Sequence, residues 1–244
     1  MGNFEVIIYQ KQAGVGYITL NRPQALNAYN IRMRDEIYEV LGAIRDDPEV
    51  NVAVFNGAGE KAFCAGADLT EFLTAPSPTI ARQVRWERDV WGLFLSINKP
   101  FIAAMHGYVL GSGIEIALCC DIRLASEDAQ FGLPEPGLGI IPAAGGSQTL
   151  PRIIGRAGAL EILLSGRWLG AKEAYRLKMV NHVVSRRELL PEAERIARKI
   201  NNYHPMAISS IKQAVNRGLD LSLDQGLALE TKLGRQLRAQ RTIS

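Results

Sequence analysis

The stretch over residues 100–151 constrains the fold more than any other part of this sequence. Five apolar residues at 101–105 follow a proline, and a short run of this kind is typical of a strand buried on both faces. A turn comes next, and Gly-Ser-Gly at 111–113 then opens an apolar segment that continues to residue 120. We expect this second segment to be a buried helix, because it is apolar on every side.

Glu115 is the one charged residue in the first turn of that predicted helix. A buried carboxylate must be paired or functional, because burying it alone is costly. The glycine-rich helix start leaves backbone N–H groups free to hold an oxyanion or a polarised carbonyl. The alternative is a structural role for Glu115, paired with an arginine such as Arg123.

A second glutamate, Glu135, lies between Pro134 and Pro136, which restrict its backbone to an extended or turn conformation. Taken alone, a glutamate in such a loop is most simply a turn residue. Downstream, Ala-Gly-Gly-Ser at 144–147 opens another helix, and we expect bare N–H groups there as well. Two carboxylates beside donor-rich helix starts suit proton transfer next to a thioester or ketone carbonyl.

Composition limits the class of protein. The 244 residues are enough for one large domain, or one domain and an appendage, and 47% hydrophobic with 22% charged residues is ordinary for a globular protein. The net charge of +3, without a basic run, gives no sign of nucleic-acid binding, while the pI near 8.8 permits an anionic substrate. The cysteines and histidines show no metal-ligand spacing.

Three features bear on location. The sequence has an odd number of cysteines, namely Cys64, Cys119 and Cys120. An odd number fits a reducing compartment, because the cysteines form no disulfide framework. The N-terminal segment lacks the pattern of a secretory or transit peptide. No apolar run approaches the roughly 18 residues of a membrane span. We therefore expect a cytoplasmic protein without a membrane segment.

Hydrophobic periodicity predicts alternating strands and helices, which is typical of an α/β fold. The predicted strands are 4–10 and 16–20, joined as a hairpin, then 50–56, 101–105, 121–126 and 180–184. The predicted helices of the same region are 30–45, capped by Asn30, then 80–97, after a break at 76–78, and 145–154. From Pro191 onward only helices are predicted, one of which begins at Pro205 with Ile208, Ile211 and Val215 facing inward.

Three motifs carry a resemblance to a known family. They are HGYVLGSGIEIALCCDIRLASEDAQFGLPEPGLGIIPAAGGSQTLPR from His106, AFCAGADL at 62–69 and LNRPQALNA at 20–28. In this order and at about this spacing they resemble the enoyl-CoA hydratase/isomerase (crotonase) family, over nearly the whole chain. The resemblance implies a crotonase spiral of ββα repeats over residues 1–190, holding the active site. It further implies a C-terminal helical region over 191–244 that builds trimers, often paired into hexamers.

The resemblance also assigns roles to individual residues. Glu115 and Glu135 match the two positions that hydratases use as base and acid, and the N–H groups of Ala67 and Ser112 match the two halves of an oxyanion hole. Small residues at 64–67 let the backbone approach a ligand closely. Asp68 is expected to cap a helix and shape its loop rather than act as a base. The substrate-binding positions implied are Ala25, Leu26, Ala65, Gly66, Asp68, Leu69, Gly111, Pro134 and Ala143.

The implied reaction is syn hydration of a 2-enoyl-CoA, as in the β-oxidation of fatty acids, with no metal and no cofactor beyond the CoA of the substrate. The runner-up is a Δ3,Δ2-enoyl-CoA isomerase. Isomerases generally need one carboxylate, so two glutamates favour the hydratase, as does the small, non-acidic Ala143 near the implied water position. A hydrolase using Ser112 with His106 is a remote alternative, because no Asp–His–Ser signature accompanies it. A non-catalytic scaffold would leave the intact motifs unexplained.

Two parts of the chain depart from the family or resist interpretation. The family often continues with a further helix carrying the pattern E-G-x-x-A-F-x-E-K-R, which helps to cover the CoA site, whereas this sequence stops at Ser244. Either the sequence is truncated there or it omits a disordered end. The segment 70–88 lines the acyl pocket in relatives, and its residues do not identify the acyl chain.

Overall fold

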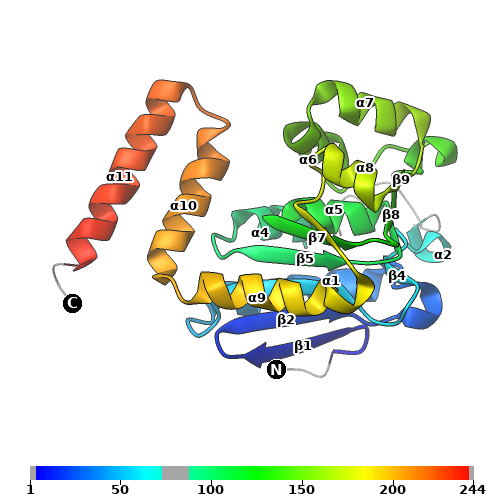
Figure 1. Ribbon diagram of the computed structural model, residues 1–244, viewed down its shortest axis with the longest axis horizontal. Coiled ribbons are helices and arrows are strands. Elements are labelled where there is room, and N and C mark those ends of the chain that lie inside the picture. Colours follow the sequence, from blue (N-terminus) through cyan, green and yellow to red (C-terminus); the bar gives the residue numbers. More distant parts are fainter. Residues whose placement is uncertain (1–3, 73–87, 242–244) are drawn as a thin grey trace.

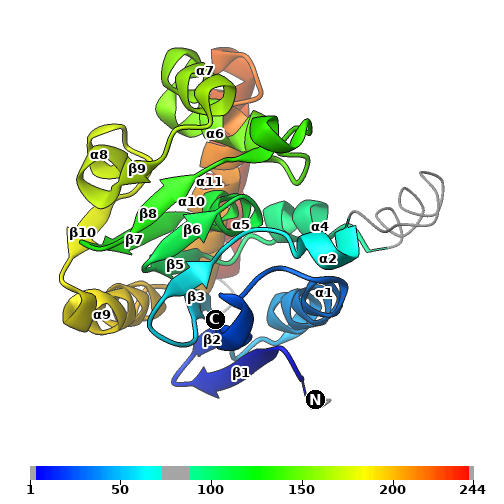
Figure 2. The same ribbon diagram turned by 90° about the vertical axis from the view of Figure 1, so that its right-hand side faces the viewer.

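The computed structural model describes residues 4–72 and 88–241. Two sheets form its centre and helices cover their faces (Figures 1 and 2). A pair of C-terminal helices stands apart from the rest (Figure 1). The α/β class predicted from the alternation of strands and helices is therefore confirmed.

The six-stranded sheet contains, in spatial order, β1 (Ile7–Gln12), β2 (Val15–Leu20), β3 (Val52–Gly57), β5 (Phe101–Met105), β7 (Ile122–Ser126) and β10 (His182–Val184). The four-stranded sheet contains β4 (Ala62–Cys64), β6 (Tyr108–Leu110), β8 (Gln130–Gly132) and β9 (Leu169–Gly170). Neighbouring strands are parallel except at the β1–β2 hairpin and the β8–β9 pair.

In the middle of the chain, consecutive strands go to different sheets. From β3 to β8, each odd-numbered strand joins the six-stranded sheet, and the strand that follows it joins the four-stranded sheet. The chain therefore advances as a spiral, and each turn adds one strand to both sheets. This is the ββα repeat that the sequence resemblance implied.

Helices connect and cover these strands. The α-helices between the sheets and on their faces are α1 (Ile31–Asp46), α2 (Leu69–Phe72), α4 (Val90–Ser96), α5 (Ser112–Cys119), α6 (Gly146–Ile154), α7 (Arg156–Ser165), α8 (Ala171–Arg176) and α9 (Leu189–Asn201). Short 3₁₀ helices are η1 (Pro23–Ala25), η2 (Glu135–Leu138) and η3 (Arg186–Glu188). The chain ends in α10 (Pro205–Gly218) and α11 (Leu223–Arg241).

Strand β5 is buried on both faces, as its apolar sequence predicts. Phe101, Ala103 and Met105 pack into the larger core, with α1, α4 and α5. Ile102 and Ala104 pack into a second core, with α9. Each large side chain buried in this way contributes roughly 1.5–3 kcal/mol to folding, so the two cores fix the sheet between α5 and α9.

Helix α1 forms as the sequence predicts. The Asn30 side chain accepts the Met33 N–H at 2.9 Å, which satisfies one of the free donors of the first turn. Its apolar face is fully buried: Met33, Ile37, Val40, Leu41 and Ile44. The chain leaves the helix at Asp47, immediately before Pro48.

The other predicted helices and strands differ from the structure mainly in where each element begins and ends. The helix predicted over 80–97 is confirmed at Val90–Ser96, while its beginning and the predicted break at 76–78 lie outside the described residues. The three cysteines are free and buried. No helix in the described parts of the chain is long and apolar enough to cross a membrane.

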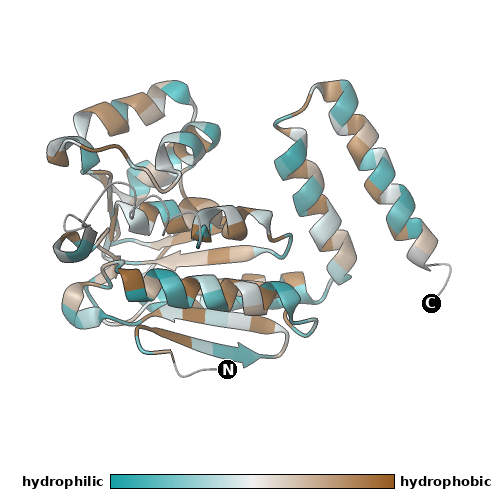
Figure 3. Ribbon diagram, turned by 180° about the vertical axis from the view of Figure 1, so that it is seen from behind, coloured by the Kyte–Doolittle hydropathy of each residue, from teal (hydrophilic) through white to brown (hydrophobic). Residues whose placement is uncertain are grey.

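The C-terminal helices behave differently from the prediction. Figure 3 shows α10 and α11 extending away from the sheets. No residue of α10 is buried within the chain, and Ile211 and Val215 are 60% and 56% exposed. The prediction that Ile211 and Val215 face inward is therefore wrong for a single chain, because no described element covers that side of the helix, whereas Ile208 is half-buried. Helix α9, in contrast, packs Leu189, Ala193 and Ala197 against the six-stranded sheet.

Candidate active site

Three neighbouring strands of the smaller sheet end at one edge. Strands β4, β6 and β8 are parallel, and neighbours in a sheet lie about 4.8 Å apart. Ala67 comes shortly after β4, Ser112 shortly after β6 and Glu135 shortly after β8. The sheet therefore brings together residues from three separate sequence motifs.

A short parallel bridge orients the segment after β4. The Tyr29 N–H donates to the Gly66 carbonyl, and the Asp68 N–H donates to the Tyr29 carbonyl, each at 2.8 Å. In a parallel pairing of this kind the intervening residue directs its own N–H to the opposite side. Ala67 therefore points its N–H away from Tyr29, and that N–H donates to no described acceptor.

The second predicted donor is Ser112, the first residue of α5. First-turn N–H groups have no partner within their helix, and the Ser112 N–H donates to no acceptor in the described part of the chain. Gly111 precedes it at φ 47°, and Gly66 precedes Ala67 at φ 100°, both left-handed conformations that favour glycine. A side chain on Gly66 would lie 3.9 Å from the Gly111 Cα. The two predicted donors, Ala67 and Ser112, therefore each follow a glycine, and these two glycines lie against one another.

Glu115 is held by the start of another helix. It is 3% exposed, and its Oε1 accepts the N–H groups of Ala144 and Gly146, each at 2.9 Å. This arrangement suits an ionised carboxylate, because charge-assisted hydrogen bonds are the stronger ones. The prediction that the N–H groups at 144–147 are bare is therefore partly wrong, since two of them donate to this carboxylate.

The structural alternative for Glu115, pairing with Arg123, finds no support. The Arg123 guanidinium donates instead to the carbonyl oxygens of Met179 and Cys120, at 2.7 and 2.6 Å. These bonds join β7 to the segments beside it. Arg123 is thus a structural residue. The two hydrogen bonds given above orient Glu115 through the backbone N–H groups of Ala144 and Gly146.

Glu135 is the first residue of η2 and is 8% exposed. Burial raises the pKa of its carboxyl group. Its Oε2 is buried without a hydrogen-bond partner among the described residues. A carboxyl group in this setting is disposed to hold a proton, which is the state required of a general acid.

Gly111 brings Glu135 next to the helix that carries Glu115. Its carbonyl accepts the Glu115 N–H at 3.1 Å, and a side chain on Gly111 would lie 2.9 Å from Glu135 Oε1. The Glu135 carboxylate therefore lies directly over the turn that starts α5. Glu135 is consequently placed over the start of the helix whose first turn contains Ser112 and Glu115.

The implied substrate-binding residues surround this point. The Leu26 carbonyl accepts the Ala65 N–H at 3.0 Å, which holds the loop after η1 against the segment after β4. The others lie beside residues already described or at helix starts: Ala25 ends η1, Leu69 starts α2, Pro134 precedes Glu135, and Ala143 is exposed next to Ala144. Their contacts with substrate stay predictions.

Asp68 has the structural role expected of it. Its Oδ2 pairs with Arg22 at 3.0 Å, and its Oδ1 accepts the N–H and hydroxyl of Thr70 in α2. The Thr70 hydroxyl, followed by Arg22, lowers the pKa of Asp68. This carboxylate is therefore committed to the loop that presents Ala67.

Sequence reasoning missed Asn27, a residue that supports the same loop. Asn27 is fully buried at φ 54°, its Oδ1 accepts the Arg22 N–H at 2.8 Å, and its amide donates to the carbonyls of Ala58 and Ala62. Asparagine tolerates this left-handed conformation, and its position at a turn of the motif at 20–28 is the signal that could have identified it.

The Ser112–His106 pair of the hydrolase alternative is not assembled. His106 is 1% exposed, and its Nε2 has no partner among the residues described. No hydrogen bond therefore joins it to the Ser112 hydroxyl, and a serine nucleophile would lack a base. In the same parts of the chain, no cluster of histidine, cysteine or acidic side chains could hold a metal ion.

Known proteins resemble this chain over nearly its full length. A sequence model of the enoyl-CoA hydratase/isomerase family matches residues 10–244. A crotonyl-CoA hydratase of Syntrophomonas wolfei is 40% identical over 228 residues, and a short-chain-enoyl-CoA hydratase of Clostridium acetobutylicum is 41% identical over 226. Each alignment covers 93% of this chain and 87% of the relative. The crystal structure of an enoyl-CoA hydratase from Bacillus anthracis matches with a TM-score of 0.90 at 36% identity, covering 95% of this chain and 90% of that one.

Proposed function

Because this chain belongs to the enoyl-CoA hydratase/isomerase family, we propose that it adds water across the 2,3 double bond of a 2-enoyl-CoA thioester. The family and the crotonase-type fold predicted from the sequence are confirmed, and the chain is an enzyme of this family. The observation that supports the choice of reaction is the presence of two buried glutamates, Glu115 in the first turn of α5 and Glu135 over the start of that helix, together with the two N–H groups that have no described acceptor.

The two N–H groups provide the electrostatic part of the mechanism. The thioester oxygen lies between the N–H groups of Ala67 and Ser112 and gains negative charge as water attacks. Donors already oriented in a site of low dielectric stabilise that charge without reorganisation, and each is worth about 3–4 kcal/mol where removal has been measured. The glycines before both residues support this role, because they let the substrate carbonyl approach the backbone.

The two glutamates divide the proton transfers. Glu115 accepts a proton from water while the water oxygen forms a bond to C3 of the substrate. Glu135 donates a proton to C2 on the same face, so that the addition is syn. The raised pKa of Glu135 and the two N–H donors to Glu115 support this division, with Glu135 as acid and Glu115 as base. Exchange of protons with solvent restores both groups.

The proposal includes the setting of the enzyme. The reaction needs no metal and no cofactor beyond the CoA portion of the substrate. The protein works in the cytoplasm, as a trimer or a dimer of trimers, on acyl-CoA rather than on nucleic acid or membranes. The exposed apolar residues of α10 and α11 support an assembly of several chains.

The test is a panel of 2-enoyl-CoA and 3-enoyl-CoA substrates with acyl chains of different length. Hydration removes the conjugated thioester, so the ultraviolet absorbance of that group should fall with 2-enoyl substrates. A rise in the same absorbance with 3-enoyl substrates, without hydration of 2-enoyl ones, would identify an isomerase instead. The panel also measures the chain-length preference.

A further inference from the structure

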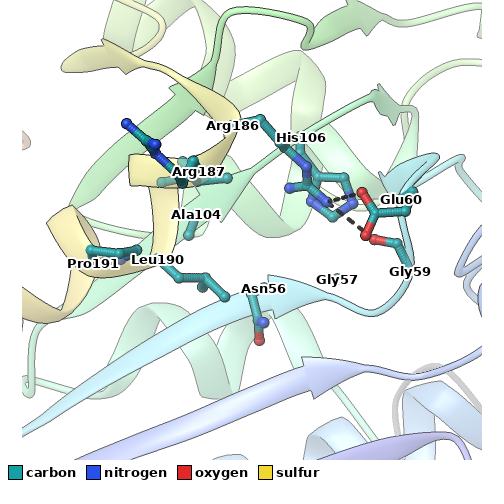
Figure 4. A pocket seen from close by; sticks show the side chains of 11 residues that line it. Asn56, Gly57, Gly59, Glu60, Ala104, His106, Arg186, Arg187, Leu190 and Pro191 are labelled. Atoms are coloured by element: carbon teal, nitrogen blue, oxygen red, sulfur yellow. Dashed lines mark hydrogen bonds and ion pairs between the residues drawn. The ribbon is translucent and has the colours of Figure 1, made fainter.

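A cavity of about 500 Å³ lies against the start of α9 (Figure 4). It is lined by the carboxyl ends of β3 and β5, the turn after β3, η3 and the first turn of α9. The lining residues used below are His106, Arg186, Arg187, Glu60, Leu190 and Pro191.

This cavity is separate from the two-glutamate site. Its wall includes Ala104 and Leu189, which belong to the core between the six-stranded sheet and α9. Helix α5, which carries Glu115, packs into the other core, together with Ala103 and Met105 of the same strand. The two sites therefore lie on opposite faces of β5.

His106 provides a buried polar group in the wall. It is 1% exposed, and its Nε2 has no hydrogen-bond partner in the described part of the protein. A buried polar atom without a partner costs about 1–3 kcal/mol, so it is rare unless something else binds it. Burial, and then the nearby Arg186, lowers the pKa of His106 to about 4, so the ring is neutral at pH 7. A neutral imidazole pairs equally well with a hydroxyl, which both donates and accepts.

Arg186 provides a cation at the same wall. One of its N–H groups donates to the Gly59 carbonyl at 3.1 Å, and the Glu60 carboxylate is 3.9 Å away (Figure 4). An arginine has five N–H donors, so most of those of Arg186 are available for a ligand. Arg187 adds a second cation to the lining and forms no salt bridge with a described carboxylate, so the cavity has two arginines and one glutamate.

The rest of the wall suits a small organic anion. Leu189, Leu190 and Pro191 form the first turn of α9, a helix of 13 residues whose positive end favours negative charge. Their side chains offer apolar contact, and the volume lies within the range of small-molecule sites. The cavity thus combines a positive end, a buried hydrogen-bonding nitrogen and an apolar side.

We propose that this cavity is a second binding site, for a small molecule that carries an oxyanion and a hydroxyl group. The oxyanion, a phosphate ester or a carboxylate, binds Arg186. The hydroxyl group binds His106 Nε2, and the carbon skeleton lies against Leu190 and Pro191. This site does not depend on the reaction proposed for the two glutamates.

Calorimetric titration of the whole protein tests the site with glycerol 3-phosphate, lactate and uncharged glycerol. We expect one or both anions to bind, and glycerol not to bind; the comparison of the two anions distinguishes a phosphate site from a carboxylate site. Arg186→Gln should weaken binding by about tenfold or more, the value of a charge-assisted hydrogen bond. The control Arg195→Gln, an exposed arginine on α9 away from the cavity, should leave binding unchanged.

The histidine ring resonances give a second readout, because the protein has only three histidines. Binding should shift the His106 signals and leave those of the exposed His182 and His204 in place. Three results would overturn the proposal: no anion binding with Kd below about 10 mM, an unchanged His106 signal at saturation, or displacement of the bound anion by CoA. The His106 readout does not depend on whether Arg186→Gln folds.

Discussion

The Glu115 carboxylate and the Gly146 N–H are joined at 2.9 Å, although they belong to different helices. A side chain on Gly146 would lie 3.0 Å from Glu115 Oε1 and 3.0 Å from the Pro142 Cβ. The absence of a side chain at 146 therefore allows the start of α6 to approach the Glu115 carboxylate. The position of Glu115, the proposed base, is set by this contact as much as by α5.

Gly146→Ala should lower kcat by about a hundredfold with little change in stability, because a displacement of the base by about 1 Å is costly in catalysis. The control is Gly137→Ala, within η2, where an added methyl group meets nothing within 4 Å. Steady-state kinetics of both variants check this. Equal activities would mean that the contact between α6 and Glu115 has no part in catalysis.

Glu115→Gln and Glu135→Gln should each lower kcat by two to four orders of magnitude, about the contribution of a general acid or base. The amide oxygen of a glutamine at 115 can still accept the N–H groups of Ala144 and Gly146, so the fold should be kept. Hydration of crotonyl-CoA and binding of CoA are measured for both variants. Near-normal hydration by Glu115→Gln, with an inactive Glu135→Gln, would favour an isomerase.

Ser112→Ala should cost less than about tenfold in kcat/KM, because the proposed mechanism uses only the backbone N–H. Ser112→Pro removes that N–H and should cost about a hundredfold to a thousandfold. Ser112 is the first residue of α5, a position where proline fits a helix, so the variant should fold. Circular dichroism checks the fold. A folded but inactive Ser112→Ala would contradict the backbone-donor role.

The sequence predicts local features well, because their causes are local. The cap at Asn30, the burial of β5 on both faces and the helix after Gly111 all follow from residues within a few positions. The resemblance to a family supplied the pairing of Glu115 with Glu135, which periodicity alone does not indicate. The binding of Glu115 by the N–H groups of 144 and 146 could not be predicted, because it depends on how two helices pack.

Buried polar residues were the least predictable. Glu36 lies within the apolar face of α1, where its carboxylate accepts the N–H groups of Glu5, Val6 and Ile7. Its burial is a tertiary effect, since the partners are about 30 residues away in sequence. The exposure of Ile211 was unpredictable for the opposite reason, because its apolar character does not say whether its own chain or another covers it.

Acid should destabilise the protein partly through His106. Its pKa is about 4 in the folded state, below the ordinary value near 6.5 because of burial and Arg186, with Asp128 acting in the opposite direction. Between pH 6.5 and 4 the unfolded chain binds a proton that the folded protein does not, so stability falls as pH falls. The full loss is about 3 kcal/mol.

Urea unfolding at several pH values checks this prediction with His106→Gln, which cannot take up the proton. The variant should lose less stability than wild type between pH 6.5 and 4. His204→Gln, an exposed histidine, is the control and should follow wild type. Identical pH dependence in all three proteins would show that His106 titrates normally.

The protein should assemble as a trimer or a multiple of three. Leu219, which follows α10, and Leu223, which starts α11, are each 78% exposed, and Leu227 is 52% exposed. Apolar surface gathered in this way is typical of a subunit contact. Light scattering at micromolar concentration measures the mass, for which a single chain is 26.8 kDa. A monodisperse monomer or dimer would contradict the assembly.

The strands β4, β6 and β8 reach the candidate active site side by side, and they divide two chemical functions between them. The ends of β4 and β6 present the proposed oxyanion donors, while the end of β8 presents only the proposed acid, Glu135. A substitution after β8 can therefore alter which proton moves without disturbing how the thioester is held. New reactions on the same activated substrate are accessible to this architecture by single changes at one strand end, so descent within such a fold can diversify chemistry while it preserves recognition of the thioester.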